Sequence, residues 1–343
     1  MERTPFVSRE AEMAELTPLL DRLPEGRGAF VLLAGEPGVG KTRLARELAA
    51  KAVERGVLAV TGSSYEVQDA TPYVPLVEAL QAATRAISAE RPSVLVGSAA
   101  PAVVRLLPDS QLASTEVSLP LKLPAEQERP YLFNRLREFL ERLATTQPLL
   151  LVLEDLHWAD ESTTLLLVQM ASWLDEMPVV VLATYREAEL GPDHPFARAL
   201  ETLIRERLAR QLTLKPLAPD GVAMMLGALS GTAPPSAIVD AVHNRTEGNP
   251  FFIEEVFKHV AEEGRLFAEP GSWRADADVA DLGVPERVRM VIERRLGRLD
   301  KITRRVLTLA AVIGPAFSYE LLEALHAVEV EELLNAVLLV PLE

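Results

Sequence analysis

One stretch, residues 29–50, constrains the fold of this chain more than any other. It reads AFVLLAGEPGVGKTRLARELAA and begins with an apolar run, residues 29–34, of the kind that forms a strand buried on both faces. Residues 35–42, GEPGVGKT, fit the spacing G-x-x-x-x-G-K-[ST] at every fixed position. Apolar residues then recur at helical spacing as far as Gly56, which can end a helix. A strand, a glycine-rich loop and a helix in this order predict the start of a parallel α/β sheet.

The loop also has the chemistry that binds phosphate. Its glycines let the backbone curl so that successive N–H groups point inward at phosphate oxygens, and the helix that follows adds its positive N-terminal end. Lys41 can reach β- and γ-phosphates, and the Thr42 hydroxyl can ligate Mg²⁺. A chance glycine-rich turn would lack the strand before it and the helix after it, so we predict that the chain binds a nucleoside triphosphate. The expected binding residues are Gly35, Glu36, Pro37, Gly38, Val39, Gly40, Lys41, Thr42 and Arg43.

Length and composition narrow the class of protein. At 343 residues the chain is long enough for two or three domains. Its 35 Lys+Arg against 50 Asp+Glu give a formal net charge of −15, which argues against non-specific nucleic-acid binding. The absence of cysteine excludes disulfides and thiolate metal sites. The N-terminus MERTPFVSRE is unlike a signal peptide and every apolar run is too short to span a bilayer, so we expect a soluble, cytoplasmic protein with no membrane partner.

The first 216 residues predict one α/β domain. Helical and apolar patterns alternate in the order that builds a parallel sheet with right-handed crossovers. The expected elements after the phosphate loop are strands over 57–61, 149–153, 179–184 and 211–214, with helices over 10–22, 74–87, 127–144 and 161–175. Asp160 is placed to cap the last of these helices.

Three charged residues follow the predicted inner strands. Glu154 and Asp155 end the strand 149–153, so they should lie at the carboxyl edge of the sheet beside the phosphate loop. One acid can hold Mg²⁺ through water while the other orients or deprotonates the attacking water, and we expect catalytic and metal roles from the pair together with Lys41. Arg186 follows the strand 179–184. It can contact a γ-phosphate, or it can be a surface arginine paired with Glu187 or Glu189, and spacing alone leaves both open.

The remaining chain reads as helical. We predict a small helical domain over 217–282, with helices over 221–229, 236–244 and 250–263 and a polar linker over 268–281. Asp220 is the expected N-cap of its first helix, and Pro250 lies in the first turn of its third. We predict a winged-helix-like domain over 283–343, with helices that include 286–299 and 302–313. Residues 286–305 carry eight Arg and Lys against three acids, which is compatible with a nucleic-acid contact. An apolar stripe on the other side of that helix and the acidic net charge favour a solvated helix face, and we expect no direct nucleic-acid contact.

Six segments in order carry a resemblance to a known family. They are PFVSRE, GEPGVGKT, LVLEDLHWADEST, ATYREAE, RTEGNPFFIEEV and VPERVRMVIERRLGRLD. Together they resemble the signal-transduction ATPases called STAND, and most of all the ATPase modules of large LuxR-type transcriptional regulators and of multidomain cyclases and kinases. The resemblance covers nearly the whole chain and is more specific than the phosphate loop alone.

The resemblance implies a P-loop nucleotide-binding domain, a small helical domain and a winged-helix domain similar to those of NB-ARC proteins. Nucleotide would lie among the three, and exchange of ADP for ATP would open the module. The matching positions are Lys41 and Thr42 for the Walker A pair, Glu154 and Asp155 for the Walker B pair, Arg186 for the first sensor, Pro250 for the proline that touches adenine, and Val7 and Arg9 for the N-terminal motif that closes over the base.

The chain departs from the family pattern at two positions and at its end. Ser8 stands where the family usually has glycine, which bears on how the backbone approaches adenine. Glu154 stands where aspartate is usual, so which acid contacts Mg²⁺ stays open. The sequence stops at Glu343, before any wing hairpin, as expected of a fragment of a longer regulator.

We therefore expect an ATP/ADP-binding switch with slow ATP hydrolysis and Mg²⁺ as cofactor. Its partners would be nucleotide, C-terminal sensor or output domains, and a second copy in a nucleotide-dependent self-association. A non-hydrolysing module that holds ADP as a structural plug is the alternative. A phosphotransferase fits less well, because the excursion over 62–125 has only three arginines, Arg85, Arg91 and Arg105, to close over a phosphate.

Overall fold

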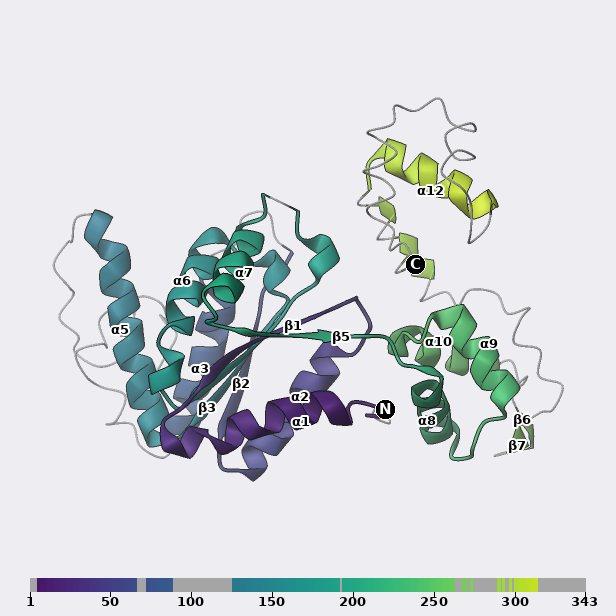
Figure 1. The fold of residues 1–343 in the computed structure, drawn as a ribbon, viewed down its shortest axis with the longest axis horizontal. Coiled ribbons are helices and arrows are strands. Elements are labelled where there is room, and N and C mark those ends of the chain that lie inside the picture. Colours follow the sequence, from purple (N-terminus) through teal and green to yellow (C-terminus); the bar gives the residue numbers. More distant parts are fainter. Residues whose placement is uncertain are drawn as a thin grey trace.

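Figure 1 shows the fold of the chain as a computed structural model. The structure describes residues 5–66, 72–88, 125–191, 193–262, 267–269, 272–273, 289–290, 292–293, 296–297 and 299–313. Most of the winged-helix-like domain predicted over 283–343 lies outside these residues, and so does the whole segment 89–124.

Five strands form one parallel sheet. Their order is β2-β3-β4-β1-β5, so β4 lies between the strand that leads into the glycine-rich loop and the strand that ends in the two acids. Paired registers such as Leu33 with Thr184 bring the carboxyl ends of these three strands to one edge of the sheet. The parallel α/β sheet confirms the predicted fold class. The strands are β1 (Ala29–Gly35), β2 (Leu58–Ser63), β3 (Leu149–Glu154), β4 (Val179–Thr184) and β5 (Arg210–Leu214).

Helices cover both faces of the sheet (Figure 1). Alternate residues of β1 divide between two clusters of buried side chains, with Val31 and Leu33 facing one helical layer and Phe30 and Leu32 the other. Each fully buried Leu or Phe contributes roughly 1.5–3 kcal/mol, so the inner strands are held firmly. One layer consists of α1 (Glu10–Asp21) and α2 (Lys41–Glu54), and the other of α3 (Val74–Ser88), α5 (Ala125–Thr146), α6 (Glu161–Ala171) and α7 (Pro195–Arg205).

Two features of this domain bear on the predictions. Asp160 caps α6, as predicted, because its side chain accepts a hydrogen bond from the backbone N–H of Thr163 at 3.0 Å. Helix α7 was not predicted, although Pro195 at its start and the buried Phe196 and Leu203 on one face are ordinary helix signals. Short 3-10 helices complete the domain: η1 (Leu23–Glu25), η4 (Leu156–Trp158), η5 (Leu174–Glu176) and η6 (Glu187–Glu189).

Three helices follow β5 and bury a core of their own. They are α8 (Pro219–Ser230), α9 (Ser236–Thr246) and α10 (Pro250–Glu262), in agreement with the predicted helices. The predicted cap at Asp220 is wrong, because α8 begins at Pro219, two residues before the predicted start, and Ala218 takes the N-cap position. Proline is favoured in the first helical turn, where its missing N–H costs nothing.

The last described elements are short. The strands β6 (Phe267–Glu269) and β7 (Ser272–Trp273) pair as an antiparallel hairpin where we expected a polar linker over 268–281, and Trp273 packs against the helical core. Helix α12 (Lys301–Ile313) agrees with the helix expected over 302–313. The domain boundaries themselves remain predictions. Within the described residues, no helix combines the length and apolar character needed to cross a bilayer.

Candidate functional site

The loop between β1 and α2 has the backbone conformation that phosphate binding requires. Gly38 and Gly40 have φ values of +86° and +106°, a region that side chains with a Cβ rarely adopt. Gly40 is the N-cap residue of α2, and a Cβ built on it would meet no atom within 4 Å. The first N–H groups of α2 have no carbonyl partner inside their helix, so they face open space at the positive end of the helix dipole.

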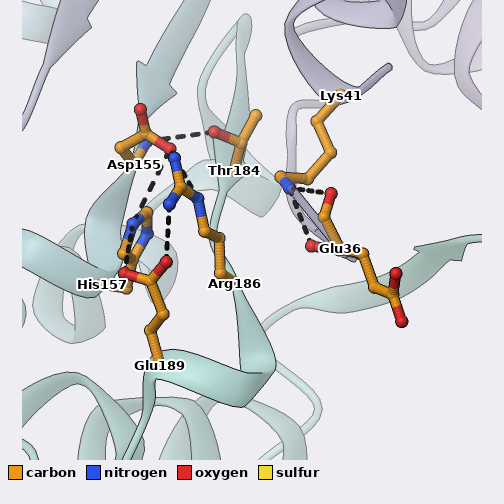
Figure 2. Close-up of polar contacts among 8 residues, drawn as sticks. Glu36, Lys41, Asp155, His157, Thr184, Arg186 and Glu189 are labelled. Carbon is orange, nitrogen blue, oxygen red and sulfur yellow. Dashed lines mark hydrogen bonds and ion pairs between the residues drawn. The ribbon is translucent and has the colours of Figure 1, made fainter. Parts of the chain in front are cut away.

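Lys41 is held inside this loop. Its side chain is only 7% exposed, and its Nζ donates hydrogen bonds to the carbonyl oxygens of Gly35 (2.7 Å) and Glu36 (2.9 Å), as Figure 2 shows. Burial, assisted by the nearby Arg186 charge, lowers the pKa of Lys41 from 10.5 to about 8. A cation that its surroundings disfavour gains more from an anionic ligand than an exposed lysine would.

The two acids after β3 are separated by the turn of the chain. Asp155 has a φ of +56°, and its backbone N–H donates to the Thr184 hydroxyl at the end of β4 (3.0 Å). Its carboxylate lies 3.9 Å from Arg186 Nε, and burial raises its pKa. Glu154 is still part of β3, where it pairs with Ser63 of β2. The adjacent acids therefore start from different backbone conformations, and only Asp155 joins the group around Arg186.

Arg186 lies between the acid and the loop because β4 lies between β3 and β1. Its Nη1 contacts Glu189 Oε1 at 2.5 Å, and its guanidinium lies 5.2 Å from the centre of the Trp158 ring. The pairing with Glu189 is one of the two roles that the sequence left open. His157 completes the group, and burial lowers its pKa to about 4, so its imidazole is neutral at pH 7.

The helical domain contacts the loop directly. Asn249, at the entrance to α10, donates from Nδ2 to the carbonyl oxygen of Pro37 (3.0 Å), and the N–H of Phe251 donates to the carbonyl oxygen of Gly38 (3.3 Å). These contacts leave no room at Gly38, where a Cβ would lie 2.7 Å from Asn249 Oδ1. The loop conformation and the position of α10 are therefore coupled.

The N-terminal segment is fastened to both parts. Arg9 is buried, and its Nη2 donates to the carbonyl oxygens of Val39 (3.1 Å) and Lys215 (2.8 Å). Arg9 also lines the site, although its guanidinium donates hydrogen bonds to backbone carbonyl oxygens of the protein itself. Ser8, at the position where related proteins were expected to have glycine, has a φ of +53°, and its hydroxyl donates to the sulfur of Met224. The positive φ explains why glycine suits this position.

These elements enclose a cleft of about 360 Å³. Both polar and apolar side chains line it. The polar lining includes Lys41, Thr42, Arg43, Arg46, Asp155 and Arg186. The apolar lining includes Phe6, Val7, Leu217, Met225, Pro250 and Phe251.

Comparison with known proteins identifies the family. Residues 5–182, just over half of the chain, match the family model described as the AAA ATPase domain. The chain belongs to the AAA ATPase domain family. It is therefore a P-loop protein of the nucleotide-binding ATPase class, which confirms the predicted P-loop ATPase at that level.

Individual proteins similar to this AAA ATPase domain protein give less information about it than the family match does. An uncharacterized protein of Rhizobium meliloti (strain 1021) is 25% identical over 338 residues, which cover 94% of this chain and 31% of that protein. The chain thus spans about a third of the length of that relative. A Walker-type ATPase of Pyrococcus abyssi superposes with a TM-score of 0.51 at 17% identity, covering 99% of this chain and 92% of the other. A variant of Thermotoga maritima RuvB reaches a TM-score of 0.43 at 17% identity, covering 97% and 88%. The Pyrococcus likeness shows the fold alone.

Most of the predicted site residues of this AAA ATPase domain protein meet in the cleft. Among the described residues that line it are Val7, Arg9, Pro37, Gly38, Val39, Gly40, Lys41, Thr42, Arg43, Asp155, Arg186 and Pro250. Gly35, Glu36 and Glu154 are not in the lining. Gly35 and Glu36 act through carbonyl oxygens on Lys41, and the Glu36 side chain is exposed. The roles of all these residues remain predictions.

Four residues in or beside the cleft were missed or left without a role. Asn249 precedes a proline at a helix start, which is a recognisable N-cap signal, and its side chain accepts from the Phe251 N–H at 3.1 Å. Trp158 and His157 follow the acids in the sequence LEDLHWAD, where no spacing rule pointed to them. Glu189 was considered only as a possible partner of Arg186.

The cleft residues fit a nucleotide with Mg²⁺. The loop and Lys41 offer N–H groups and a cation to phosphates, whereas the Thr42 hydroxyl and the Asp155 carboxylate are the hard oxygen donors that Mg²⁺ prefers. The apolar residues of the lining offer proline, methionine and phenylalanine surfaces to a base.

Proposed function

We propose that this chain is an ATP- and ADP-dependent signal-transduction switch with slow ATP hydrolysis, which acts as the regulatory module of a larger, transcriptional regulator. One observation carries the proposal. The helical domain is hydrogen-bonded to the phosphate loop itself, through Asn249 to Pro37 and through Phe251 to Gly38. A nucleotide that changes the conformation of the loop therefore also changes how the helical domain packs against it.

The polar side chains of the cleft lining perform the chemistry in this proposal. Lys41 and the loop N–H groups hold the β- and γ-phosphates, and Arg186 meets the charge that develops on the γ-phosphoryl group. Asp155 orients the attacking water and accepts its proton, a role that suits a carboxylate whose pKa burial has raised. Thr42 would hold Mg²⁺, which supplies positive charge to the phosphate oxygens when bound. A metal role for Glu154 remains a prediction, since its side chain would have to turn toward the cleft.

In this proposal the apolar side chains of the lining hold the base, and they contact it in the closed form. Val7 belongs to the N-terminal segment and Pro250 to the helical domain, and both line the cleft beside Met225. Closure around ADP would bring these surfaces onto the adenine ring, and exchange for ATP would release them. Nucleotide-dependent self-association and C-terminal output domains belong to the same proposal, and the threefold greater length of the Rhizobium relative supports a larger parent protein.

A second function has support from the same contacts. Arg186 is already paired with Glu189, and α10 is already hydrogen-bonded to the loop. Such an arrangement also suits a module that holds ADP permanently and never hydrolyses ATP.

Two measurements on the purified chain separate these functions. The nucleotide that co-purifies is released by denaturation and identified by chromatography, and ATP turnover is then measured for the parent and for Lys41→Ala. We expect bound ADP and a slow turnover that Lys41→Ala abolishes. Bound ADP without turnover would favour the holding module, and a chain that binds neither nucleotide would contradict both.

A further inference from the structure

A buried histidine beside the site lacks hydrogen bonds. The His157 side chain has no exposed surface, and neither ring nitrogen has a hydrogen-bond partner among the described residues. Its Nε2 lies 3.4 Å from Glu189 Oε2 and 3.9 Å from Asp155 Oδ1, without forming a hydrogen bond to either. Buried polar groups are nearly always satisfied, so an unsatisfied one next to a phosphate site calls for an explanation.

Glu189 stands between this histidine and Arg186. Its Oε1 contacts Arg186 Nη1 at 2.5 Å while its Oε2 faces His157 (Figure 2). Both members of the Arg186–Glu189 pair are three-quarters buried, with side-chain exposures of 22% and 25%. Solvent therefore screens this pair less than it screens a surface pair. The Glu189 carboxylate therefore contacts Arg186 with one oxygen and faces His157 with the other.

We infer that Glu189 sets the preference of the site for ATP over ADP, by holding Arg186 when no γ-phosphate is present and moving to His157 when one is. The inference rests on the proposed function, because it assigns the γ-phosphate to Arg186. Glu189 is a positioning residue in this account and does not touch the nucleotide.

The physical reason is competition for one guanidinium. A carboxylate and a γ-phosphate are both strong acceptors for arginine, so whichever is present in the better geometry takes it. Release of Glu189 would leave a largely buried carboxylate without this cation, which is costly. The neutral imidazole of His157 has one N–H to donate, and a small movement at Nε2 supplies the missing partner.

The same contacts define what Glu189 prevents. Arg186 Nε is 3.9 Å from Asp155 Oδ1, so Arg186 has a second acid within reach. Glu189 draws the guanidinium over the Trp158 ring and away from a closer pairing with Asp155. The two arrangements available to Arg186 without Glu189 are therefore the γ-phosphate and Asp155, and these predict opposite effects on ATP affinity.

The test is a double-mutant cycle on the full chain. Dissociation constants of ADP and of a non-hydrolysable ATP analogue are measured by titration calorimetry for the parent, Glu189→Gln, Arg186→Ala and the double variant. We expect Glu189→Gln to raise the preference for the ATP analogue by about 5-fold or more, in the range typical of coupled sites. In the Arg186→Ala background the same change should have no effect on the preference. Glu187→Gln, two residues away in η6 and exposed, is the matched control and should leave the preference unchanged.

A second variant tests the histidine. His157→Phe removes the alternative partner and should lower the preference for the ATP analogue, whereas His157→Gln keeps a donor and should lower it less. Thermal melts show whether either variant is folded, and the Glu189 cycle remains decisive if neither is.

The outcomes separate the inference from the function on which it rests. If Arg186→Ala weakens the ATP analogue selectively but Glu189→Gln leaves or lowers the preference, Glu189 is no competitor and only the inference is overturned. If Arg186→Ala weakens both nucleotides equally, the sensor role fails and the inference fails with it.

Discussion

The two walls of the cleft are held in place by different forces. Lys41, Asp155 and Arg186 follow three adjacent strands, and the ladder of the sheet and its buried side chains fix their positions. Pro250 reaches the cleft from the helical domain, whose hydrogen bonds to the loop come from Asn249 and Phe251. A typical hydrogen bond contributes about 0.5–1.5 kcal/mol net, whereas the inner strands bury many side chains at roughly 1.5–3 kcal/mol each.

This difference indicates which wall can move. Coupling free energies between ligand sites are typically about 1–3 kcal/mol, which is similar to the strength of two hydrogen bonds and far below that of a sheet. In the proposed switch, the sheet wall is the rigid part that binds phosphates, and the helical wall is the part that a change of nucleotide releases. Each of the mutations that follow perturbs one of these walls.

The largest effect is expected in the sheet wall at Asp155. Asp155→Asn removes the group that accepts a proton from water while keeping its size, so ATP turnover should fall by about 10²–10⁴-fold with ATP affinity nearly unchanged. Glu154→Gln is the comparison, because Glu154 is adjacent in sequence but absent from the cleft lining among the described residues. Steady-state ATPase rates decide it, and an unaffected Asp155→Asn with an inactive Glu154→Gln would reverse the roles of the two acids.

The next effect concerns nucleotide affinity. Lys41→Ala removes the buried cation from the loop, and both ATP and ADP should bind about 100-fold more weakly or not measurably, since hydrogen bonds to charged groups contribute about 1.5–3 kcal/mol. Lys51→Ala, near the other end of α2, is the control and should bind normally. Calorimetric titration measures both variants. Parent-like affinity in a folded Lys41→Ala protein would show that the loop does not bind phosphate.

A smaller effect follows from the pKa of Lys41. The free protein lowers this pKa to about 8, and a bound phosphate would raise it again, so binding takes up a proton above pH 8. ATP affinity should therefore decrease as the pH rises from 8 toward 10, by at most about 10-fold per pH unit. Lys41→Arg, which does not titrate in this range, should bind with a flatter pH dependence. Equal slopes for parent and variant would remove Lys41 as the cause.

The same shift affects the nucleotide-free fold. Between pH 8 and 10.5 the unfolded chain keeps the Lys41 proton that the folded chain has lost, so this group adds to the free energy of unfolding as the pH rises through that window.

The sequence predicted the sheet wall better than the helical wall, for a physical reason. Phosphate chemistry demands fixed residue types at fixed spacing, so GEPGVGKT and the acids after a buried strand could be recognised directly. Strand order is not encoded in that way, and the position of Arg186 between Asp155 and Lys41 follows only once β4 is known to lie between β3 and β1. Because the strand order was not known, the sequence left two roles open for Arg186, a γ-phosphate contact and a pairing with an acid such as Glu189.

The helical wall depends on contacts between residues far apart in the chain. Asn249 and Pro37 are separated by 212 positions in the sequence, and no local sequence pattern predicts their hydrogen bond. The hairpin β6–β7 was missed because its strands have three and two residues, too few for an alternating pattern to be visible. Asp220 was misplaced as a cap because Pro219, a better first-turn residue, precedes it.

The most direct test of the switch perturbs one residue of each wall and compares the nucleotides. Dissociation constants of ADP and of a non-hydrolysable ATP analogue are measured for Pro250→Gly and Arg186→Ala, with thermal melts to confirm folding. Pro250 should support the closed ADP form, so Pro250→Gly should weaken ADP more than the ATP analogue, by about 5- to 10-fold. Arg186→Ala should weaken the ATP analogue more than ADP by a similar factor. Opposite selectivities of the two variants are the result that the switch predicts, and equal weakening of both nucleotides by each variant would contradict it and favour a passive binding module.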